Sequence, residues 1–518
     1  MAGVLLHLPM YLHGKSMHYH LNGMPMDTPM TVGMVLIVLG LAAVAYGLVT
    51  PELLRSRPAT EVRVRALEDA RLRPAHLALI AVLTIAVTID AMKPISLGFV
   101  APGVAKEYGL KSAMNPHGHP AVALLPFFGL TGTVVGSFLW GWLGDRIGRR
   151  ASILFAGVLF VTTATCGAMP SFNWNLAMCF LMGAGAGGML PITFSLLAET
   201  IPARHRGWIM VLIGGTVALA YVLTSWLSSS LVPHYSWRIL WLVGMPSGVA
   251  LILLNRWIPE SPRFLLAHGR EDEARSIMAR YGATAVEVTD EEPEPGSAEG
   301  ADERGGYSRL FRPPYAGLTS AVVVLGLGIG LVTYGFQLWI PSNLQKLGLA
   351  QATADRALRD SALLGLPLVF IAAALYGLWS AKKTIILFTA LVGAALAVLV
   401  FAGDDLAKHR DWLYVLLAGP IVGTSTIGAI LAAYSSEIYP TRIRSRGSGL
   451  SAGVGKFGGV AVTILLIAGI AAPSIGVTSL LGTVPLILAV IAVALFGVET
   501  RRAAAPKPVA AEVAPAEA

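Results

Sequence analysis

The sequence predicts an all-α membrane protein, and three observations support this fold class. The chain has 518 residues, of which 55% are hydrophobic and only 13% are charged, whereas soluble domains usually carry about 25% charged residues. The apolar residues form successive runs of roughly 18–25 residues, the length of a helix that crosses a bilayer. The net charge of +8 comes from Lys and Arg in alternate short loops, as the positive-inside rule expects. The basic charge therefore indicates membrane orientation and does not predict a nucleic-acid partner.

Thirteen apolar runs are candidate membrane spans. The first, at 30–49, follows about thirty residues that lack the basic start of a signal peptide, so we expect a retained extra helix. An arginine-rich linker at 51–75 comes next. The other twelve runs fall into two groups of six, at 76–257 and 317–498. These groups predict two six-helix bundles.

The remaining segments complete the predicted organisation. Residues 1–75 comprise a His- and Met-rich segment, the extra helix and the linker. A charged central loop at 258–316 contains a low-complexity stretch at 287–306 that we expect to be disordered, and a tail follows at 499–518. The basic loops fall on one side of the predicted membrane, which places the central loop and the C-terminus in the cytoplasm and residues 1–29 outside.

Both groups of six carry the same charged motif. The sequences AETIPARHRG at 198–207 and SEIYPTRIRSRG at 436–447 each follow the fourth helix of their group. Both contain the pattern E-x-x-P-x-R-x-R. Repeated halves with a substrate site between them are typical of secondary transporters.

A further loop carries a specific resemblance. GWLGDRIGRR at 141–150 resembles the signature loop of the major facilitator superfamily, and the resemblance extends over 76–498. PESPRFLLAHGR at 259–270 resembles the sugar-porter and organic-ion branches, whereas YGFQLWIPSNLQKLGL at 334–349 resembles the aromatic acid:proton symporters. The resemblance implies two six-helix halves that rock about a central substrate site.

The charged loops predict a conformational latch on the cytoplasmic side. Asp145 and the arginines after it could form charge pairs between elements that separate during transport. The alternative is a solvated loop with ordinary positive-inside charge. The corresponding loop at 377–383 lacks the acid, so its latch should be weaker. The predicted latch residues are Gly141, Asp145, Arg146, Gly148, Arg149, Arg150, Glu199, Arg204, Arg206, Glu437, Arg442 and Arg444.

Asp90 and Lys93 lie inside the first helix of the first group. A charge at the centre of a membrane helix costs about 2.5–3.5 kcal/mol on insertion scales, so two of them indicate a function. Positions i and i+3 share a helix face, and we expect the two side chains to pair and to point into the central cavity. Pro94 should break the helix beside them. The alternative is a static ion pair that orients the helix.

We expect Asp90 to take up a proton and so to release Lys93 for an anionic substrate. The aromatic-acid branch has D-G-x-D at this point, and DAMKPISLGFVAP at 90–102 keeps the first acid but replaces the second with Lys93. An arginine that is frequent in that branch corresponds to Cys179. Aromatic-acid specificity therefore does not carry over directly. The opposite arrangement, in which Asp90 holds a cationic substrate, stays open.

Four further side chains are candidates for substrate contact. Tyr334 and Gln337 lie in the seventh helix of the core, and Thr424 and Tyr434 lie in the tenth. Helix packing explains each of them equally well. Lys456 lies near the cytoplasmic end of the eleventh helix, where we expect its long side chain to reach the membrane surface.

The sequence predicts no metal site, no cofactor and no enzyme activity. Residues 1–30 are rich in His and Met, which are ligands suited to copper, but their spacing is irregular. GLSAG at 449–453 matches the G-x-S-x-G motif of hydrolases, but it opens an apolar helix after an arginine-rich loop. No phosphate-cradling loop is present to indicate ATP as the energy source.

We therefore expect a proton-coupled symporter of a small organic anion. Its partners would be the substrate, the proton and the bilayer of the plasma (inner) membrane, and it would function as a monomer. Three alternatives stay open: an efflux carrier driven by proton antiport, a copper importer, and a non-transporting receptor built on a transporter fold.

Overall fold

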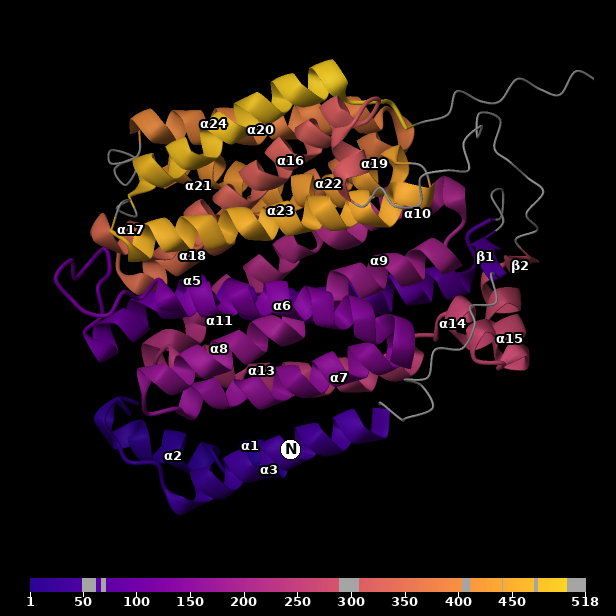
Figure 1. Ribbon diagram of the computed structural model, residues 1–518. Coiled ribbons are helices and arrows are strands. Elements are labelled where there is room, and N and C mark those ends of the chain that lie inside the picture. Colours follow the sequence, from indigo (N-terminus) through magenta and orange to yellow (C-terminus); the bar gives the residue numbers. More distant parts are fainter. Residues whose placement is uncertain are drawn as a thin grey trace, which may run out of the picture.

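The computed structural model describes residues 1–48, 62–66, 71–287, 307–402, 410–439, 441–469 and 474–500, which are almost entirely helical (Figure 1). Among these residues, twelve helices are long and apolar enough to cross a membrane. Helix α6 (Leu124–Ile147) adds a shorter apolar stretch, Leu124–Trp140. The predicted fold class, two six-helix bundles and an extra N-terminal helix, is confirmed. Residues 288–306, which make up nearly all of the predicted disordered stretch, lie outside the described residues.

The first bundle consists of six spans, several of which are divided into two helices. Glycines allow close packing here: a Cβ on Gly183 would collide with the backbone of Gly129, so α8 lies directly against α6. The elements are α5 (Pro74–Tyr108), α6, α7 (Arg149–Thr162), η2 (Thr163–Ala168), α8 (Phe172–Ala186), α9 (Met189–Thr200), α10 (Ala203–Gly215), α11 (Val217–Tyr235), α12 (Arg238–Leu242), α13 (Gly244–Leu254) and η3 (Asn255–Trp257).

The second bundle has the same number of spans and lies beside the first (Figure 1). Two of its spans contain π-helical turns, η5 and η7, which lie in contact with each other. The elements are α16 (Ala316–Leu331), η5 (Val332–Gln337), α17 (Ile340–Lys346), α18 (Gln351–Gly365), α19 (Pro367–Leu378), α20 (Ala381–Ala402), α21 (Arg410–Ala418), η7 (Gly419–Gly423), α22 (Thr424–Ile438), α23 (Thr441–Ile467) and α24 (Ile475–Phe496).

The N-terminal segment packs against the first bundle only in part. It comprises α1 (Ala2–Leu5), α2 (Leu8–His13), η1 (Gly14–Met17) and α3 (Thr28–Leu48). Helix α3 contacts α1 and α7 and leaves most of its apolar surface exposed. His7, Met10 and Met30 are buried, and the Nδ1 of His7 lies 2.7 Å from the carbonyl oxygen of Gly3. These three residues therefore help to pack the segment.

A small β-sheet joins the linker to the central loop. The prediction of an all-α protein did not include this sheet. Strand β1 (Val62–Ala66) pairs antiparallel with β2 (Ala283–Glu287), and Val62 lies opposite Glu287. The sequence of β1, VRVRA, alternates apolar and basic residues with the period of a strand. The sequence alone indicates only that it is part of a basic linker. The sheet lies beside the central-loop helices α14 (Pro262–Ala267) and α15 (Glu271–Tyr281), and η4 (Tyr307–Phe311) leads into α16.

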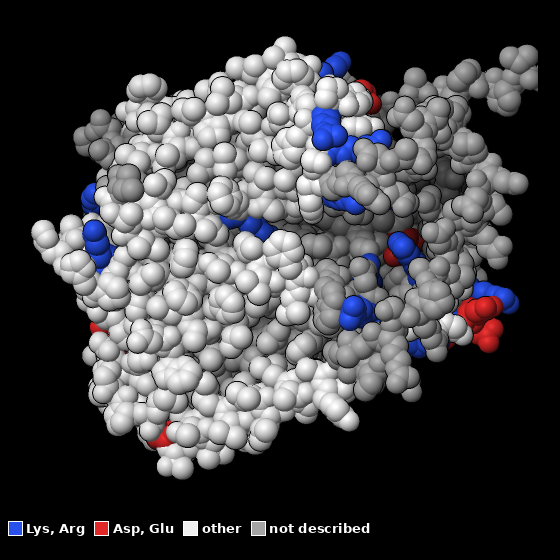
Figure 2. Space-filling view, viewed as in Figure 1, with Lys and Arg blue, Asp and Glu red and all other residues white. Residues whose placement is uncertain are grey.

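Charge is concentrated at one end of the molecule. Figure 2 shows Lys and Arg gathered at the end that holds α14, α15, β1 and β2 in Figure 1. We call this the basic end and the other the distal end. The long sides between them expose large apolar side chains such as Phe138, Phe370 and Phe401. This distribution is typical of a protein whose sides face lipid.

Candidate functional site

Helix α5 carries both predicted intramembrane charges, but the structure does not pair them. Asp90 and Lys93 are buried, with 7% and 2% of their surface exposed, and α5 continues through Pro94 without a break. The Lys93 ammonium donates to the Phe160 carbonyl and to Thr163 Oγ1, the latter at 2.6 Å. The expected Asp90–Lys93 ion pair is not among those of the described residues, so this part of the prediction is wrong.

The first bundle forms a socket for Lys93. The ammonium lies 4.4 Å from the centre of the Phe160 ring, at the point where α7 approaches the tighter helix η2 and backbone carbonyls become available to other donors. A Cβ on Gly244 of α13 would lie 2.5 Å from Lys93 Cε. The glycine therefore makes room for the lysine. These contacts, which sequence spacing cannot show, explain why Lys93 turns towards α7 and α13 and away from Asp90.

Lys456 is the intramembrane cation that joins the two bundles. It lies on α23 in the second bundle, is half-buried, and donates to Ser137 Oγ on α6 of the first bundle. We expected this lysine to reach the membrane surface, but its contact instead crosses the interface. The sequence did contain an indication that Lys456 is functional, because a lysine within an apolar membrane helix is a candidate functional group.

Tyr334 and Gln337 both lie on η5, near the interface between the bundles. A Cβ on Gly459 would collide with the Tyr334 ring, so the ring packs on α23 one turn from Lys456. The Gln337 amide donates to the carbonyls of Pro420 and Ile421 in η7, at 2.5 and 2.9 Å. Both η5 and η7 are π-helical turns, which are frequent at functional sites. The structure therefore brings Tyr334 close to Lys456 and gives Gln337 backbone partners.

The other two predicted contacts lie in different surroundings. Thr424 is buried at the start of α22, and its hydroxyl has no hydrogen-bond partner among the described residues. Tyr434 lies further along α22, where its hydroxyl donates to the Val498 carbonyl and accepts from the Val498 N–H, both at 2.7 Å. It thus holds the chain that follows α24. The structure does not bring Tyr434 together with Lys456.

Asp355 is a buried acid that the sequence interpretation missed. It lies on α18 of the second bundle and is fully buried against α11 of the first. Ser228 donates to its Oδ2 at 2.6 Å, whereas its Oδ1 has no partner among the described residues. The polar stretch QATADRALRD concealed it, although Leu358 and Ala362 on the same helical face are apolar.

Six of the twelve predicted latch residues lie in two clusters at the basic end. In the first, the backbone N–H groups of Arg149 and Arg150 donate to the Glu260 carboxylate at 2.6 and 3.3 Å, as anions do at helix N-termini. Burial raises the pKa of Glu260, and these hydrogen bonds act against the rise. Glu199 accepts from Ser261 at 2.5 Å. Gly148, with φ of +93°, starts the helix directly against Glu260.

The second cluster joins the two bundles. Tyr376 on α19 donates to Glu437 on α22 at 2.8 Å. Arg206 on α10 of the first bundle attracts the same carboxylate, and a Cβ on Gly207 would lie 2.6 Å from it. Arg146 is partly buried, and Arg150 and Arg204 are exposed. The positions Gly141, Asp145, Arg442 and Arg444 are described only as parts of α6 and α23.

No metal centre emerges from these clusters. Within the described ranges, no group of three or more His, Cys, Asp or Glu side chains is arranged to hold a metal ion. Cys166 and Cys179 are buried free thiols.

Two six-helix bundles with buried charges at their interface define a membrane transporter of the major-facilitator type. The sequence matches the family of sugar (and other) transporters over residues 103–504, and the chain belongs to this family.

Its relatives and structural neighbours are transporters. It is 26% identical over 413 residues to the niacin transporter NiaP of Acinetobacter baylyi, covering 78% of this chain and 89% of the relative. It is 27% identical to the 4-hydroxybenzoate transporter PcaK of the same organism, covering 72% and 80%. The solved structure of the proton:xylose symporter XylE bound to 6-bromo-6-deoxy-D-glucose superposes with a TM-score of 0.64 at 16% identity, covering 82% of this chain and 96% of that one.

Proposed function

We propose that the protein is a proton-coupled symporter of a small organic anion. The observation that carries the proposal is geometric: Asp90 is buried on α5 of the first bundle, and Lys456 of the second bundle donates to Ser137 across the interface. The relatives support the chemistry of the substrate. Niacin and 4-hydroxybenzoate, the compounds named for two of them, both carry a carboxylate.

Coupling follows from the cost of burying unpaired charge. In this proposal, the ionised Asp90 carboxylate balances the charge of the Lys456 ammonium. Protonation of Asp90 would leave Lys456 without an anion, and a buried charge without a partner costs several kcal/mol. A substrate carboxylate can then replace Asp90 as the anion of the pair. The bundles would close at low cost with both proton and substrate bound, or with neither, which is the requirement for symport.

The orientation proposed for the protein follows its charge. The basic end carries the signature loop, α14 and α15, so the positive-inside rule places it in the cytoplasm. Residues 1–29 and the distal end would then face outward across the plasma membrane, and the C-terminus would be cytoplasmic. The cluster of Arg206, Tyr376 and Glu437 would act as the latch between the bundles on the cytoplasmic side. We also propose that the protein functions as a monomer.

The remaining candidates keep subordinate roles in this proposal. Tyr334 packs one turn from Lys456 and could orient an aromatic substrate, and the unpartnered hydroxyl of Thr424 could contact it. A substrate role for Lys93, Gln337 or Tyr434 would require each to leave partners that it holds in the structure.

Uptake into proteoliposomes under an imposed pH gradient tests the proposal. With nicotinate as the probe, Asp90→Asn should abolish gradient-driven accumulation but retain exchange between internal and external nicotinate, because the asparagine mimics the protonated acid. Asp360→Asn is the matched control, since Asp360 is a partly exposed acid paired with Arg359. Undiminished gradient-driven accumulation in Asp90→Asn would refute the proton role. Accumulation driven by the reversed gradient would instead indicate antiport.

A further inference from the structure

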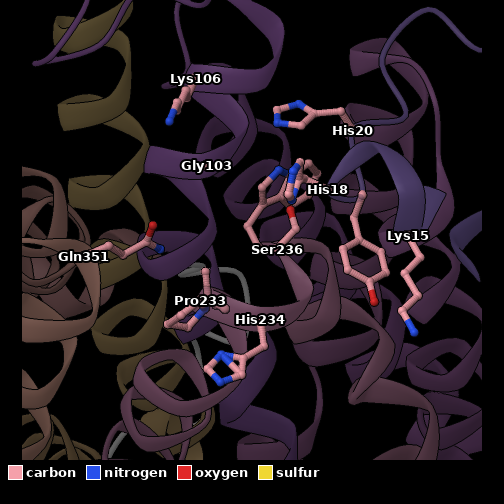
Figure 3. A pocket seen from close by; sticks show the side chains of 12 residues that line it. Lys15, His18, His20, Gly103, Lys106, Pro233, His234, Ser236 and Gln351 are labelled. Carbon is pink, nitrogen blue, oxygen red and sulfur yellow. The ribbon is translucent and has the colours of Figure 1, made fainter.

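A cleft of about 470 Å³ opens at the distal end of the molecule (Figure 3). Its volume lies within the usual range of about 300–1,000 Å³ for small-molecule sites. The N-terminal segment forms one wall, helices α5 and α11 form the others, and Gln351 of α18 contributes from the second bundle. The cleft therefore touches the extra segment and both bundles.

Apart from Tyr19, the ionisable side chains that line the cleft are lysines and histidines. Lys15, His18, His20, Lys106 and His234 line it, and Figure 3 shows His18 lying between His20 and His234. No Asp or Glu is among the described lining residues. A cleft lined by charge of one sign concentrates ligands of the opposite sign and accelerates their binding.

The acid that follows Lys106 in the chain is already neutralised. Glu107 follows Lys106 on α5 and forms a buried ion pair with Arg238 at 2.6 Å. Its carboxylate also accepts from the Leu21 N–H at 2.9 Å and from the Trp237 Nε1 at 2.8 Å. These bonds fix the N-terminal segment to the first bundle. They leave the positive charge of the cleft without an opposing carboxylate among the side chains that line it.

Backbone strain is concentrated around the same cleft. Within the described part of the chain, the non-glycine residues with left-handed φ are His18, Tyr19 and Ser236, at 51°, 62° and 63°. All three line the cleft. Such conformations are costly for residues with a Cβ, and they cluster at binding and active sites. The stacked rings of Tyr11 and Tyr19, with centres 4.7 Å apart, help to hold the strained turn.

We propose that this cleft is an external binding site for a small organic carboxylate, separate from Asp90 and Lys456. The lysines and histidines would hold the carboxylate, while Tyr19, Val232 and Trp237 offer apolar surface to the rest of the molecule. The three imidazoles are not grouped as metal ligands are. The inference rests on the proposed function for its orientation and its substrate class. It adds a first binding step at the outer mouth of the transport path.

Direct binding of nicotinate to full-length protein in nanodiscs tests the cleft. The Lys456→Met variant serves as background, because it removes the cation of the central site. Adding Lys15→Gln, His20→Gln and Lys106→Gln should weaken nicotinate binding at least about tenfold, since each lost charge-assisted hydrogen bond is worth roughly that factor or more. Lys346→Gln, an exposed lysine on α17 outside the cleft, is the matched control and should leave the affinity unchanged.

Three comparisons make the outcome specific. Lys15→Arg with Lys106→Arg should retain binding, which separates loss of charge from loss of folding. Nicotinamide, which lacks the negative charge, should bind much more weakly than nicotinate. Unchanged affinity in the glutamine variant would overturn the inference, and equal displacement of nicotinate by inorganic phosphate would overturn the carboxylate assignment.

The two proposals fail separately. If Asp90→Asn loses gradient-driven accumulation while the glutamine variant binds nicotinate normally, the cleft inference is wrong and the transport proposal stands. If the glutamine variant loses binding but Asp90→Asn keeps gradient-driven accumulation, the cleft stands and the proton role of Asp90 is wrong.

Discussion

The two intramembrane lysines of this protein have contrasting surroundings. Lys93 makes its hydrogen bonds within the first bundle, to Phe160 and Thr163, in a socket opened by Gly244. Lys456 belongs to the second bundle and bonds to Ser137 of the first. If the bundles rock against each other as proposed, Lys93 would keep its partners, whereas Lys456 would have to exchange its own. A buried charge can couple a motion to binding only if its partners change during that motion.

The largest effect is expected at Lys456. Replacing it with methionine removes the cation that donates to Ser137 across the interface and that balances Asp90 or the substrate carboxylate in the proposed mechanism. Removing one member of such a charge pair costs about 3–5 kcal/mol. We expect the Lys456→Met variant to lose nicotinate uptake by about 100-fold or more in proteoliposomes. Lys456→Arg, which keeps the charge, should retain part of it. Wild-type uptake by Lys456→Met would show that the contact across the interface has no part in transport.

An intermediate effect is expected at Asp355, whose partner Ser228 also lies across the interface. Burying an ionised carboxylate costs several kcal/mol, so the contact between α18 and α11 is more stable when Asp355 is protonated. We therefore expect this contact to weaken, and the exchange rate of the wild type to fall, as pH rises. Asparagine cannot ionise. In Asp355→Asn, the ratio of the nicotinate exchange rate at about pH 8 to that at about pH 6 should therefore rise by roughly threefold or more.

Ser228→Ala provides the comparison for this experiment. It removes the hydroxyl but keeps the acid, so its exchange rate should still fall as pH rises. A pH profile of Asp355→Asn identical to that of the wild type would exclude Asp355 from the gating of this face.

The smallest effect is expected at Lys93. Its acceptors keep a partner when it is replaced, because the Thr163 hydroxyl also donates to the Phe160 carbonyl at 3.1 Å. Lys93 has no ion-pair partner among the described residues, so an apolar side chain of similar size leaves no buried charge uncompensated. Lys93→Met should therefore change the nicotinate Km by less than about threefold and the melting temperature by a few degrees. A tenfold loss of affinity would restore the substrate role that the sequence predicted for Lys93.

Much of the architecture could be predicted from the sequence, because a membrane helix must satisfy its backbone hydrogen bonds within one apolar run. Each span, including the extra N-terminal one, was visible in this way. Asp90 was visible as a costly charge within such a run. The paired strands β1 and β2 were not predicted, since their partners are separated by more than two hundred residues of sequence.

The site was harder to predict because its partners come from different helices. The i, i+3 spacing of Asp90 and Lys93 predicted a pair, but the opening at Gly244 and the carbonyl of Phe160 lie on other spans. Lys456 was assigned to the membrane surface because it lies near the end of its helix. That position does not reveal that Ser137 on another helix accepts its hydrogen bond. Asp355 was hidden in a polar stretch. The strained turn at His18 and Tyr19 depends on positive φ angles, which no motif in the sequence predicts.

The bonds that Glu107 makes to Leu21 and Asn22 have a practical consequence. They fasten the chain before α3 to the first bundle, so that this segment reports the position of that bundle. Met17 is exposed at the distal end on this segment, and Lys346 is exposed on α17 of the other bundle. A donor dye at residue 17 and an acceptor dye at residue 346 would follow the rocking of the halves by energy transfer, without a label in the transport path.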